Sequence, residues 1–191
     1  MKKRDAIVKR VFDICFSFFG LVLLFIPITF FIIISTIDTG RSGLFIQKRI
    51  GQFGELFNIY KLRTMRETPS NERIVSSIGC FFRRTKLDEL PQLFNVLKGD
   101  MSFVGPRPDI EGFANQLSLE DRIILEVRPG ITGLATLHFK NEESILAKKN
   151  NPHEYNRNVI WPKKVELNKI YIKEYSFYND LKILFRTIFI L

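Results

Sequence analysis

The sequence predicts a mostly helical α+β protein, with an apolar N-terminal membrane segment and a cytosolic body that contains a small β element. Three observations lead to this fold class. A long uncharged run lies near the N-terminus, two short strand patterns flank a glycine-containing turn, and apolar residues recur at helical spacing further along. The predicted division is a membrane segment over residues 1–40 and a cytosolic domain with interfacial amphipathic helices over 41–191.

The apolar run extends from Ile14 to Ile37 and is long enough for a helix to cross roughly 30 Å of hydrocarbon. A spanning helix, a re-entrant hairpin and a buried core helix are compatible with it. The core helix fits least, because the run is apolar on every face. Pro27, near the middle, predicts a kink. Basic residues flank both sides, which favours the cytoplasm for both ends, as in a hairpin, although a kinked span stays open. They are Lys2, Lys3, Arg4, Lys9, Arg10, Arg41, Lys48 and Arg49.

Charge and cysteine content narrow the function classes. The 29 Lys and Arg residues against 20 Asp and Glu give a net charge of +9, which suits nucleic acid, phospholipid head groups or a phosphorylated small molecule. Cys15 and Cys80 offer no disulfide framework, and His138 and His153 lack neighbours at zinc-ligand spacing. These features agree with a reducing cytoplasmic setting.

The β element is predicted as a hairpin of strands Leu44–Ile50 and Leu56–Leu62 around the turn 51–54. Lys61 and Arg63 alternate with Leu62, so they are expected to share one face, either as substrate-binding cations or as the solvated face of the hairpin. Residues 67–73 read as an exposed loop. The next segments are expected to be a helix over 85–97, a Gly- and Pro-rich loop, a helix over 110–127, a turn at 129–133 and a final helix over 179–191. The final helix fits an interfacial or a core-facing position.

Candidate chemistry centres on Asp88 and Glu89. Thr85 and Asp88 have the spacing of a capping box, which is one explanation of Asp88. That explanation leaves the neighbouring cations unexplained, and a helix N-terminus beside cations can bind phosphate. A carboxylate there could hold a divalent cation or attack phosphorus. Because adjacent helical residues point about 100° apart, the two acids must differ in role. The cations are Arg83, Arg84 and Lys86.

A second candidate element is Pro106-Arg107-Pro108, which stiffens the backbone around one guanidinium and could present it to a phosphate or a pyrimidine ring. With four further stretches it forms an ordered set that closely resembles the bacterial sugar transferases. These are small monotopic phosphoglycosyl transferases that prime glycan assembly on polyprenol phosphate. The matching stretches are KRVFD at 9–13, FNIYKLRTM at 57–65, LDELPQLFNVLKGDMSFVGPRP at 87–108, VRPGITG at 127–133, and the late WPKKVELNKIYIKEYSFYNDLKIL.

The resemblance implies a specific reaction. An adjacent Asp-Glu pair is catalytic in that family and matches Asp88 and Glu89. The Asp attacks the β-phosphate of a UDP-sugar, UMP leaves, and polyprenol phosphate (undecaprenyl phosphate) displaces the sugar phosphate from the enzyme. The Glu activates the acceptor or supports the Asp, and Mg²⁺ bound near Asp88 offsets the diphosphate charge. The Pro106–Pro108 element is associated with the uridine nucleotide, and Lys61, Arg63, Arg83 and Arg84 are expected to contact substrate.

The resemblance also implies a location and partners. The protein is expected on the cytosolic face of the bacterial cytoplasmic membrane, with membrane lipids and downstream glycosyltransferases as further partners and without nucleic acid. The family's apolar segment is re-entrant and commonly breaks at Ser-Pro, whereas this chain has Ile26-Pro27. After the PGITG turn the chain also departs from its relatives, so the sugar and the pathway are not identified. A non-catalytic membrane scaffold of the same fold and a membrane-tethered nucleic-acid binder are the rival functions.

Overall fold

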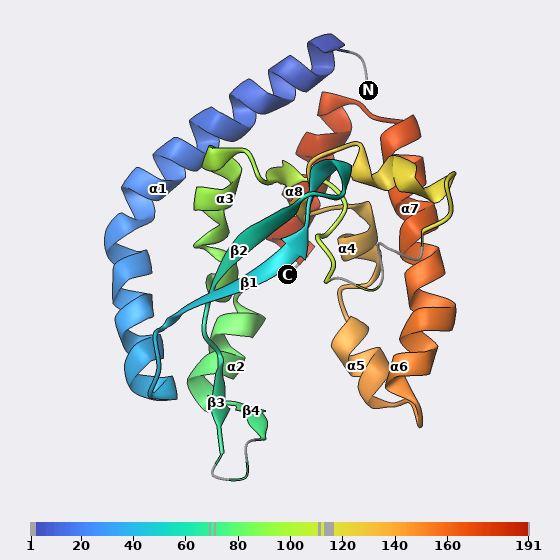
Figure 1. The fold of residues 1–191 in the computed structure, drawn as a ribbon. Coiled ribbons are helices and arrows are strands. Elements are labelled where there is room, and N and C mark those ends of the chain that lie inside the picture. The colour runs from blue at the N-terminus through green and yellow to red at the C-terminus, as the bar shows by residue number, and fades with distance from the viewer. Residues whose placement is uncertain (1–2, 69, 71, 111, 113–116, 191) are drawn as a thin grey trace.

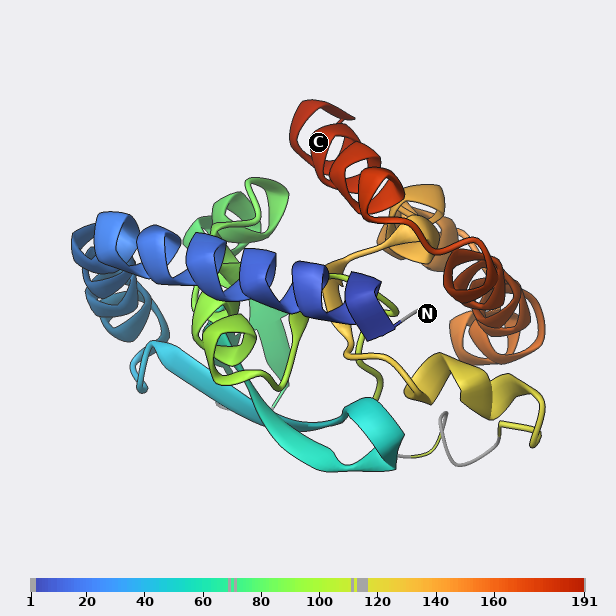
Figure 2. The same ribbon diagram turned by 90° about the horizontal axis from the view of Figure 1, so that it is seen from above.

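The computed structural model describes residues 3–68, 70, 72–110, 112 and 117–190, and it confirms a mostly helical protein with small β elements (Figure 1). The first element is a long helix, α1 (Lys3–Thr39), which contains Pro27 without interruption. Its two halves run in different directions (Figures 1 and 2). The chain therefore bends within a continuous helix.

The apolar part of α1 lies on the surface. Only 6 % of its most apolar 18-residue window is buried, so the interpretation as a core helix is wrong. Large side chains such as Leu23, Ile26 and Ile37 are 78–79 % exposed. A helix with this surface is long and apolar enough to enter a membrane.

Both ends of α1 are fastened to the same body. Near the N-terminal end, Arg10 donates hydrogen bonds to the carbonyls of Val96 and Leu97, at 2.6 and 2.8 Å. Near the C-terminal end, the Ser35 hydroxyl donates to the Arg63 carbonyl at 2.6 Å. Because α1 bends, residues near both of its ends can hydrogen-bond to the rest of the protein.

The predicted hairpin is confirmed with its predicted bounds. Strands β1 (Leu44–Ile50) and β2 (Leu56–Leu62) pair antiparallel around the 3₁₀ turn η1 (Gln52–Gly54). The expected loop over 67–73 is bounded by a second small hairpin of β3 (Met65–Glu67) and β4 (Arg73–Val75), and two of its residues, 69 and 71, lie outside the described residues.

The predicted helix over 85–97 is wrong, because three shorter elements take its place. They are α2 (Ser77–Arg84), the 3₁₀ turn η2 (Leu87–Glu89) and α3 (Gln92–Lys98). Thr85 ends α2 instead of capping a new helix, since its hydroxyl donates to the carbonyls of Phe81 and Phe82. Lys86 then adopts the left-handed conformation (φ 58°), which breaks the helix. The capping-box explanation of Asp88 is therefore also wrong.

The region after α3 holds a parallel strand pair that sequence periodicity missed. β5 (Ser102–Val104) lies within the predicted loop, and β6 (Gly130–Thr132) lies within the predicted turn. Close approach explains the glycines here, because a Cβ on Gly130 would sit 2.1 Å from the Gly105 nitrogen. The helix predicted over 110–127 is wrong for the described residues, which form only the 3₁₀ turn η4 (Asp121–Leu125) as regular structure. Residues 111 and 113–116 of that prediction lie outside the described residues.

The C-terminal third is helical. It comprises α4 (Leu134–His138), α5 (Glu142–Ala147), α6 (Pro152–Tyr155), the π turn η5 (Asn156–Ile160), α7 (Trp161–Lys173) and α8 (Phe177–Ile190). The main core gathers Val104, Ile124, Val165 and Ile172 between these helices and the strands.

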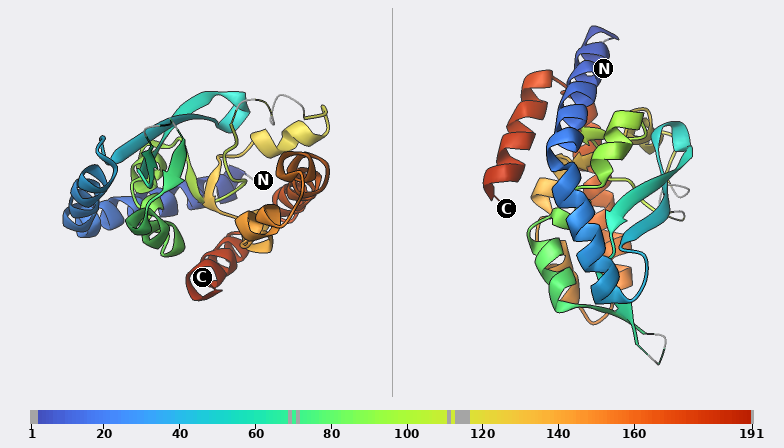
Figure 3. Two further views of the ribbon diagram at one scale, coloured as in Figure 1. Left: turned by 90° about the horizontal axis from the view of Figure 1, so that it is seen from below. Right: turned by 90° about the vertical axis from the view of Figure 1, so that its left-hand side faces the viewer.

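The predicted final helix is confirmed as α8, starting two residues earlier than expected, and residue 191 lies outside the described residues. Phe185 and Ile188 are 62 and 69 % exposed, whereas Ile183 on the same helix is buried. α8 lies beside α1, on the side away from the β1–β2 hairpin (Figures 2 and 3). One side of the molecule thus presents apolar surface from both helices.

Candidate active site

Asp88 and Glu89 occupy the short turn η2 between α2 and α3, and both are buried, at 9 and 8 % exposure. The left-handed conformation of Lys86 turns the chain just before them, and Pro91 precedes the first turn of α3 just after them. Both adjacent carboxylates are thus buried although they lie in one short turn.

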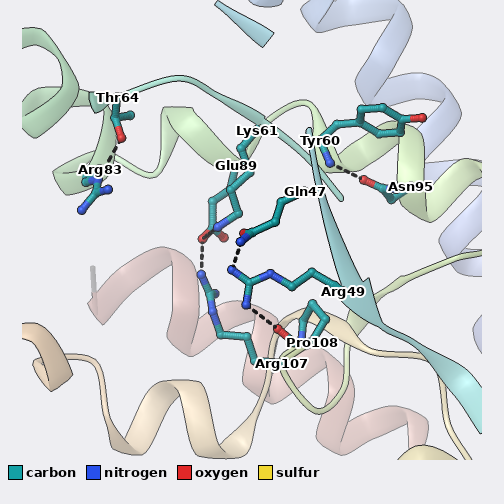
Figure 4. A network of polar contacts seen from close by, with 10 residues as sticks. All are labelled: Gln47, Arg49, Tyr60, Lys61, Thr64, Arg83, Glu89, Asn95, Arg107 and Pro108. Atoms are coloured by element: carbon teal, nitrogen blue, oxygen red, sulfur yellow. Dashed lines mark hydrogen bonds and ion pairs between the residues drawn. The ribbon is translucent and has the colours of Figure 1, made fainter. Parts of the chain in front are cut away.

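Glu89 is the center of an ion-pair cluster (Figure 4). Its Oε1 lies 2.6 Å from a guanidinium nitrogen of Arg107 and 3.3 Å from the Lys61 ammonium. Burial alone would raise the pKa of Glu89, but attraction to Arg107 and Lys61 outweighs it and lowers the pKa to about 2. Glu89 is therefore ionised at physiological pH and bound to both cations.

Asp88 has a different environment. Its Oδ1 is buried and has no hydrogen-bond partner among the described residues. Burial, followed by repulsion from Glu89, raises the pKa of Asp88, while Lys61 and Lys86 act in the opposite direction. An unsatisfied buried oxygen is costly, and strain, a bound water or ion, or a catalytic role can account for it.

Elements far apart in the sequence position the cations. Lys61 comes from β2, and Arg107 comes from the loop after β5, where the Gly130 N–H donates to the Pro106 carbonyl at 2.8 Å. Arg49, on β1, donates to the Pro108 carbonyl at 3.5 Å and to the Gln47 side chain at 2.7 Å (Figure 4). The parallel pair β5–β6 and the hairpin together hold the Pro-Arg-Pro turn against the carboxylates.

Asn95, on α3, hydrogen-bonds to the backbone of β2. It receives the Tyr60 N–H on its side-chain oxygen at 3.0 Å and donates to the Asn58 carbonyl at 2.7 Å (Figure 4). These bonds join α3 to β2, so the turn that carries the two acids and the strand that carries Lys61 keep a fixed relation.

The structure brings together only part of the predicted set. Lys61, Asp88, Glu89 and Arg107 meet, and the charge of Arg83 acts on Asp88 while its Nε donates to Thr64 at 3.0 Å. Arg63 follows Leu62, the last residue of β2, and its contacts lie outside the carboxylate cluster.

Arg63 instead donates to the Ser42 carbonyl at 2.7 Å and packs over the Phe45 ring. Arg84 is exposed at the end of α2. Sequence reasoning missed that Arg49 binds the Pro108 carbonyl and the Gln47 side chain. The two-residue spacing of Gln47 and Arg49 on a predicted strand could have indicated that they share one face.

Asp88 is the residue of this turn that could hold a divalent cation. Among the described residues no group of three or more His, Cys, Asp or Glu side chains could hold a metal by protein ligands alone. Mg²⁺ is commonly bound by one or two carboxylates together with substrate phosphates and water. Of the two acids, Glu89 is paired with Arg107 and Lys61, whereas the buried Oδ1 of Asp88 has no hydrogen-bond partner among the described residues.

An exposed apolar helix joined to a buried carboxylate pair with adjacent cations fits the class of membrane-associated transferases that act on phosphate-bearing groups. The chain belongs to the bacterial sugar transferase family, whose sequence profile matches residues 4–191.

Similar proteins include an uncharacterized sugar transferase, EpsL, of Bacillus subtilis, which is 36 % identical over 95 % of this chain and 86 % of its own length. An undecaprenyl-phosphate galactose phosphotransferase of Salmonella typhimurium is 30 % identical over 97 % of the chain. A UDP-glucose:undecaprenyl-phosphate glucose-1-phosphate transferase of Klebsiella pneumoniae is 35 % identical over 97 %. The chain spans only 40 % of the length of each of these last two relatives.

Proposed function

We propose that this protein is a phosphoglycosyl transferase that moves a sugar 1-phosphate from a UDP-sugar to polyprenol phosphate and releases UMP. The reaction would start assembly of a bacterial glycoconjugate such as a capsule, exopolysaccharide, O-antigen or glycoprotein glycan. The names of its relatives support the two substrates. The observation that carries the proposal is a contrast within one turn. An Asp88 oxygen has no partner among the described residues, whereas a Glu89 oxygen is bound by both Arg107 and Lys61.

In the first step Asp88 is the nucleophile. A carboxylate oxygen attacks the β-phosphorus of the UDP-sugar, and the bond from that phosphorus to the bridging oxygen breaks. UMP leaves with the bonding electrons, and the sugar phosphate remains on Asp88 as an acyl phosphate. Burial raises the pKa of Asp88 and so makes its carboxylate more basic than in water.

In the second step the phosphate of polyprenol phosphate attacks the same phosphorus. The bond between phosphorus and the Asp88 oxygen breaks, which regenerates the carboxylate and yields polyprenol diphosphosugar. Neither displacement requires net transfer of a proton when the acceptor phosphate enters as its dianion. The two displacements thus return the enzyme to its starting state.

Glu89 supports the reaction by holding Arg107 and Lys61 in place. A carboxyl group with a pKa of about 2 is a weak base at neutral pH, so activation of the acceptor is the less suitable of its two candidate roles. Glu89 instead orients Arg107 and Lys61, whose remaining donors face charge on the diphosphate. Arg107, with Pro106 and Pro108, would contact the uridine nucleotide side of the donor.

Mg²⁺ is the proposed cofactor, with Asp88 as its protein ligand, and it would supply charge neutralisation at the diphosphate. EDTA is expected to abolish turnover and added Mg²⁺ to restore it, measured as UMP release. Full turnover in the chelator would leave the arginine and lysine side chains as the only electrostatic stabilisers and would remove Mg²⁺ from this proposal.

The proposed location is the cytosolic face of the bacterial membrane, with α1 entering the bilayer and returning. The attachment of Arg10 and Ser35 to one body supports this topology, because a straight span of about 30 Å would place these residues at opposite membrane surfaces. Pro27 lies between them, within the exposed apolar surface. The membrane lipids around α1 and α8 and the downstream glycosyltransferases are the further proposed partners.

Cysteine labelling tests the topology. In a background with Cys15 and Cys80 replaced, single cysteines at positions 3 and 70 are expected to react only from the cytoplasmic side. Pro27→Leu restores the hydrogen-bond donor that proline lacks and is expected to expose position 3 to the outside in a fraction of molecules. Labelling of position 3 from outside in the parent protein would establish a span instead.

The function itself is tested by incubating the membrane-reconstituted protein with polyprenol phosphate and a panel of UDP-sugars while UMP is measured. At least one UDP-sugar is expected to yield UMP and a lipid diphosphosugar. A protein that binds membranes but releases no UMP from any donor would be a non-catalytic scaffold of a glycan-assembly complex, which is the alternative function.

A further inference from the structure

The first turn of α3 carries a further buried polar group close in sequence to the two acids. Gln92 is the first residue of α3 and is 2 % exposed. Its Nε2 is buried and has no hydrogen-bond partner among the described residues. Such a group is costly, and strain, a bound water or a ligand can account for it. The position of Gln92 decides between these explanations.

A neighbouring amide on the same side of α3 is bonded quite differently. Asn95 is 0 % exposed and follows Gln92 by three residues, so the two side chains lie on one face of the helix. Asn95 accepts the Tyr60 N–H and donates to the Asn58 carbonyl. One amide thus joins α3 to β2, whereas the Nε2 of the other is bonded to no described part of the protein.

The helical backbone places Gln92 next to the carboxylates. The chain from η2 into α3 stays right-handed, because Leu90 and Pro91 both have αR angles. Gln92 follows Glu89 by three residues and Asp88 by four, and these are the spacings at which side chains on a helix are neighbours. Long side chains on a helix point back over the preceding turn. The Gln92 amide is thus directed toward the turn that carries the two acids.

The contacts of β2 support the same placement. Tyr60 bonds to Asn95 through its backbone N–H, and the next residue, Lys61, reaches Glu89 (Figure 4). Gln92 lies along the chain between Glu89 and Asn95, three residues from each. Contacts to β2 therefore flank Gln92 on both sides, at the part of the strand that carries Lys61.

We propose that Gln92 is a further catalytic residue, whose Nε2 donates a hydrogen bond to a non-bridging oxygen of the phosphoryl group that Asp88 receives. This role rests on the transfer reaction proposed for the protein. Lys61 and Arg107 share one Glu89 oxygen, and a neutral donor beside Asp88 adds a hydrogen bond without another charge. In phosphoryl transfer the charge of the transition state is spread over the equatorial oxygens, and fixed donors directed at them lower the barrier.

Gln92→Met and Gln92→Glu test this role in the membrane-reconstituted protein, with UMP release measured over a range of UDP-sugar concentrations. Methionine keeps the length of the side chain but has no donor, and glutamate keeps the shape but carries an acceptor and a charge. Turnover is expected to fall by about 10²-fold in Gln92→Met and by at least as much in Gln92→Glu. The KM for the UDP-sugar should change by less than about threefold, because the bond acts mainly in the transition state.

Thermal unfolding separates this role from a structural one. Because Nε2 has no acceptor in the described protein, Gln92→Met is expected to unfold at the temperature of the parent or above it. Gln52→Met is the matched control, since it removes an exposed donor to the Glu126 carbonyl in the turn η1 and should turn over as the parent does.

Turnover of Gln92→Met within about threefold of the parent would overturn the role of Gln92 and leave the transfer reaction intact. Lost turnover together with a lower unfolding temperature would overturn it as well, because the amide would then be a structural group. If the parent itself released no UMP from any donor, the transfer reaction would be wrong, and the role of Gln92 with it.

Discussion

Two buried clusters of opposite charges lie in this protein, and they differ in how completely their carboxylates are satisfied. Asp180 on α8 accepts hydrogen bonds from both Lys9 and Tyr171, and the Tyr171 hydroxyl lies 2.8 Å away. At the Asp88 turn only Glu89 is paired, and Asp88 keeps a buried oxygen without a partner among the described residues. A fully satisfied cluster ties elements together, whereas a partly satisfied one retains capacity for a substrate or an ion.

From this difference we expect substitution of Asp88 to have the largest effect on turnover. Asp88→Asn keeps the size of the side chain but removes the nucleophile, so UMP release is expected to fall by about 10³-fold or more. Because burial disfavours the charged form of Asp88, the free energy of unfolding should stay the same or rise. Turnover within a few fold of the parent, measured at saturating UDP-sugar, would contradict the nucleophilic role.

The Lys9–Asp180 pair should show the reverse pattern. Lys9→Met leaves a buried carboxylate uncompensated, and the free energy of unfolding in urea is expected to fall by about 3–5 kcal/mol. The double variant Lys9→Met/Asp180→Leu should recover most of this loss. Lys163→Met, which breaks an exposed pair with Glu166, is the matched control and should cost no more than about 1 kcal/mol. Equal losses in the single and double variants would mean that the loss does not come from leaving the Asp180 carboxylate uncompensated.

Glu89 connects stability to pH at the active site. Its folded-state pKa of about 2 lies below the ordinary value of 4.5, so its ion pairs stabilise the fold above pH 4.5, and this contribution is lost as the pH falls toward 2. The free energy of unfolding of the parent should therefore exceed that of Glu89→Gln by on the order of 3 kcal/mol at pH 7. The two proteins should converge between pH 4.5 and pH 2. A difference that does not depend on pH would contradict the pairing with Arg107 and Lys61.

The smallest expected effect separates two neighbouring arginines. The charge of Arg83 favours the ionised form of Asp88, so Arg83→Gln should shift the acid limb of the pH–turnover profile slightly upward. Arg84→Gln, an exposed neighbour on α2, should leave that limb unchanged. An equal shift in both variants would indicate a general surface-charge effect.

The sequence predicted the parts that depend on local patterns. Strand alternation and turn residues specify the β1–β2 hairpin, and its bounds agree with the structure. The strand alternation around Leu62 identified Lys61, and the motif around Asp88 and Glu89 and the Pro-Arg-Pro turn identified the two acids and Arg107. The structure brings these four residues together.

Other parts depend on contacts between distant segments, which periodicity does not record. The Thr85 hydroxyl can close one helix or begin the next, and only the left-handed turn at Lys86 decides between them. Likewise, β5 and β6 are three residues each and pair across a long connection, so neither shows a strand pattern of its own. The lack of a partner for the Asp88 Oδ1 among the described residues also results from such packing.

The central claim is that Asp88 carries the sugar phosphate between the two substrates. The most direct measurement is the intact mass of the protein after incubation with Mg²⁺ and a turned-over UDP-sugar in the absence of polyprenol phosphate, followed by peptide mapping. The account predicts a mass increase equal to one sugar phosphate on the peptide that contains Asp88, its disappearance when polyprenol phosphate is added, and its absence in Asp88→Asn. UMP release without an adduct, or an adduct on another residue, would contradict the account.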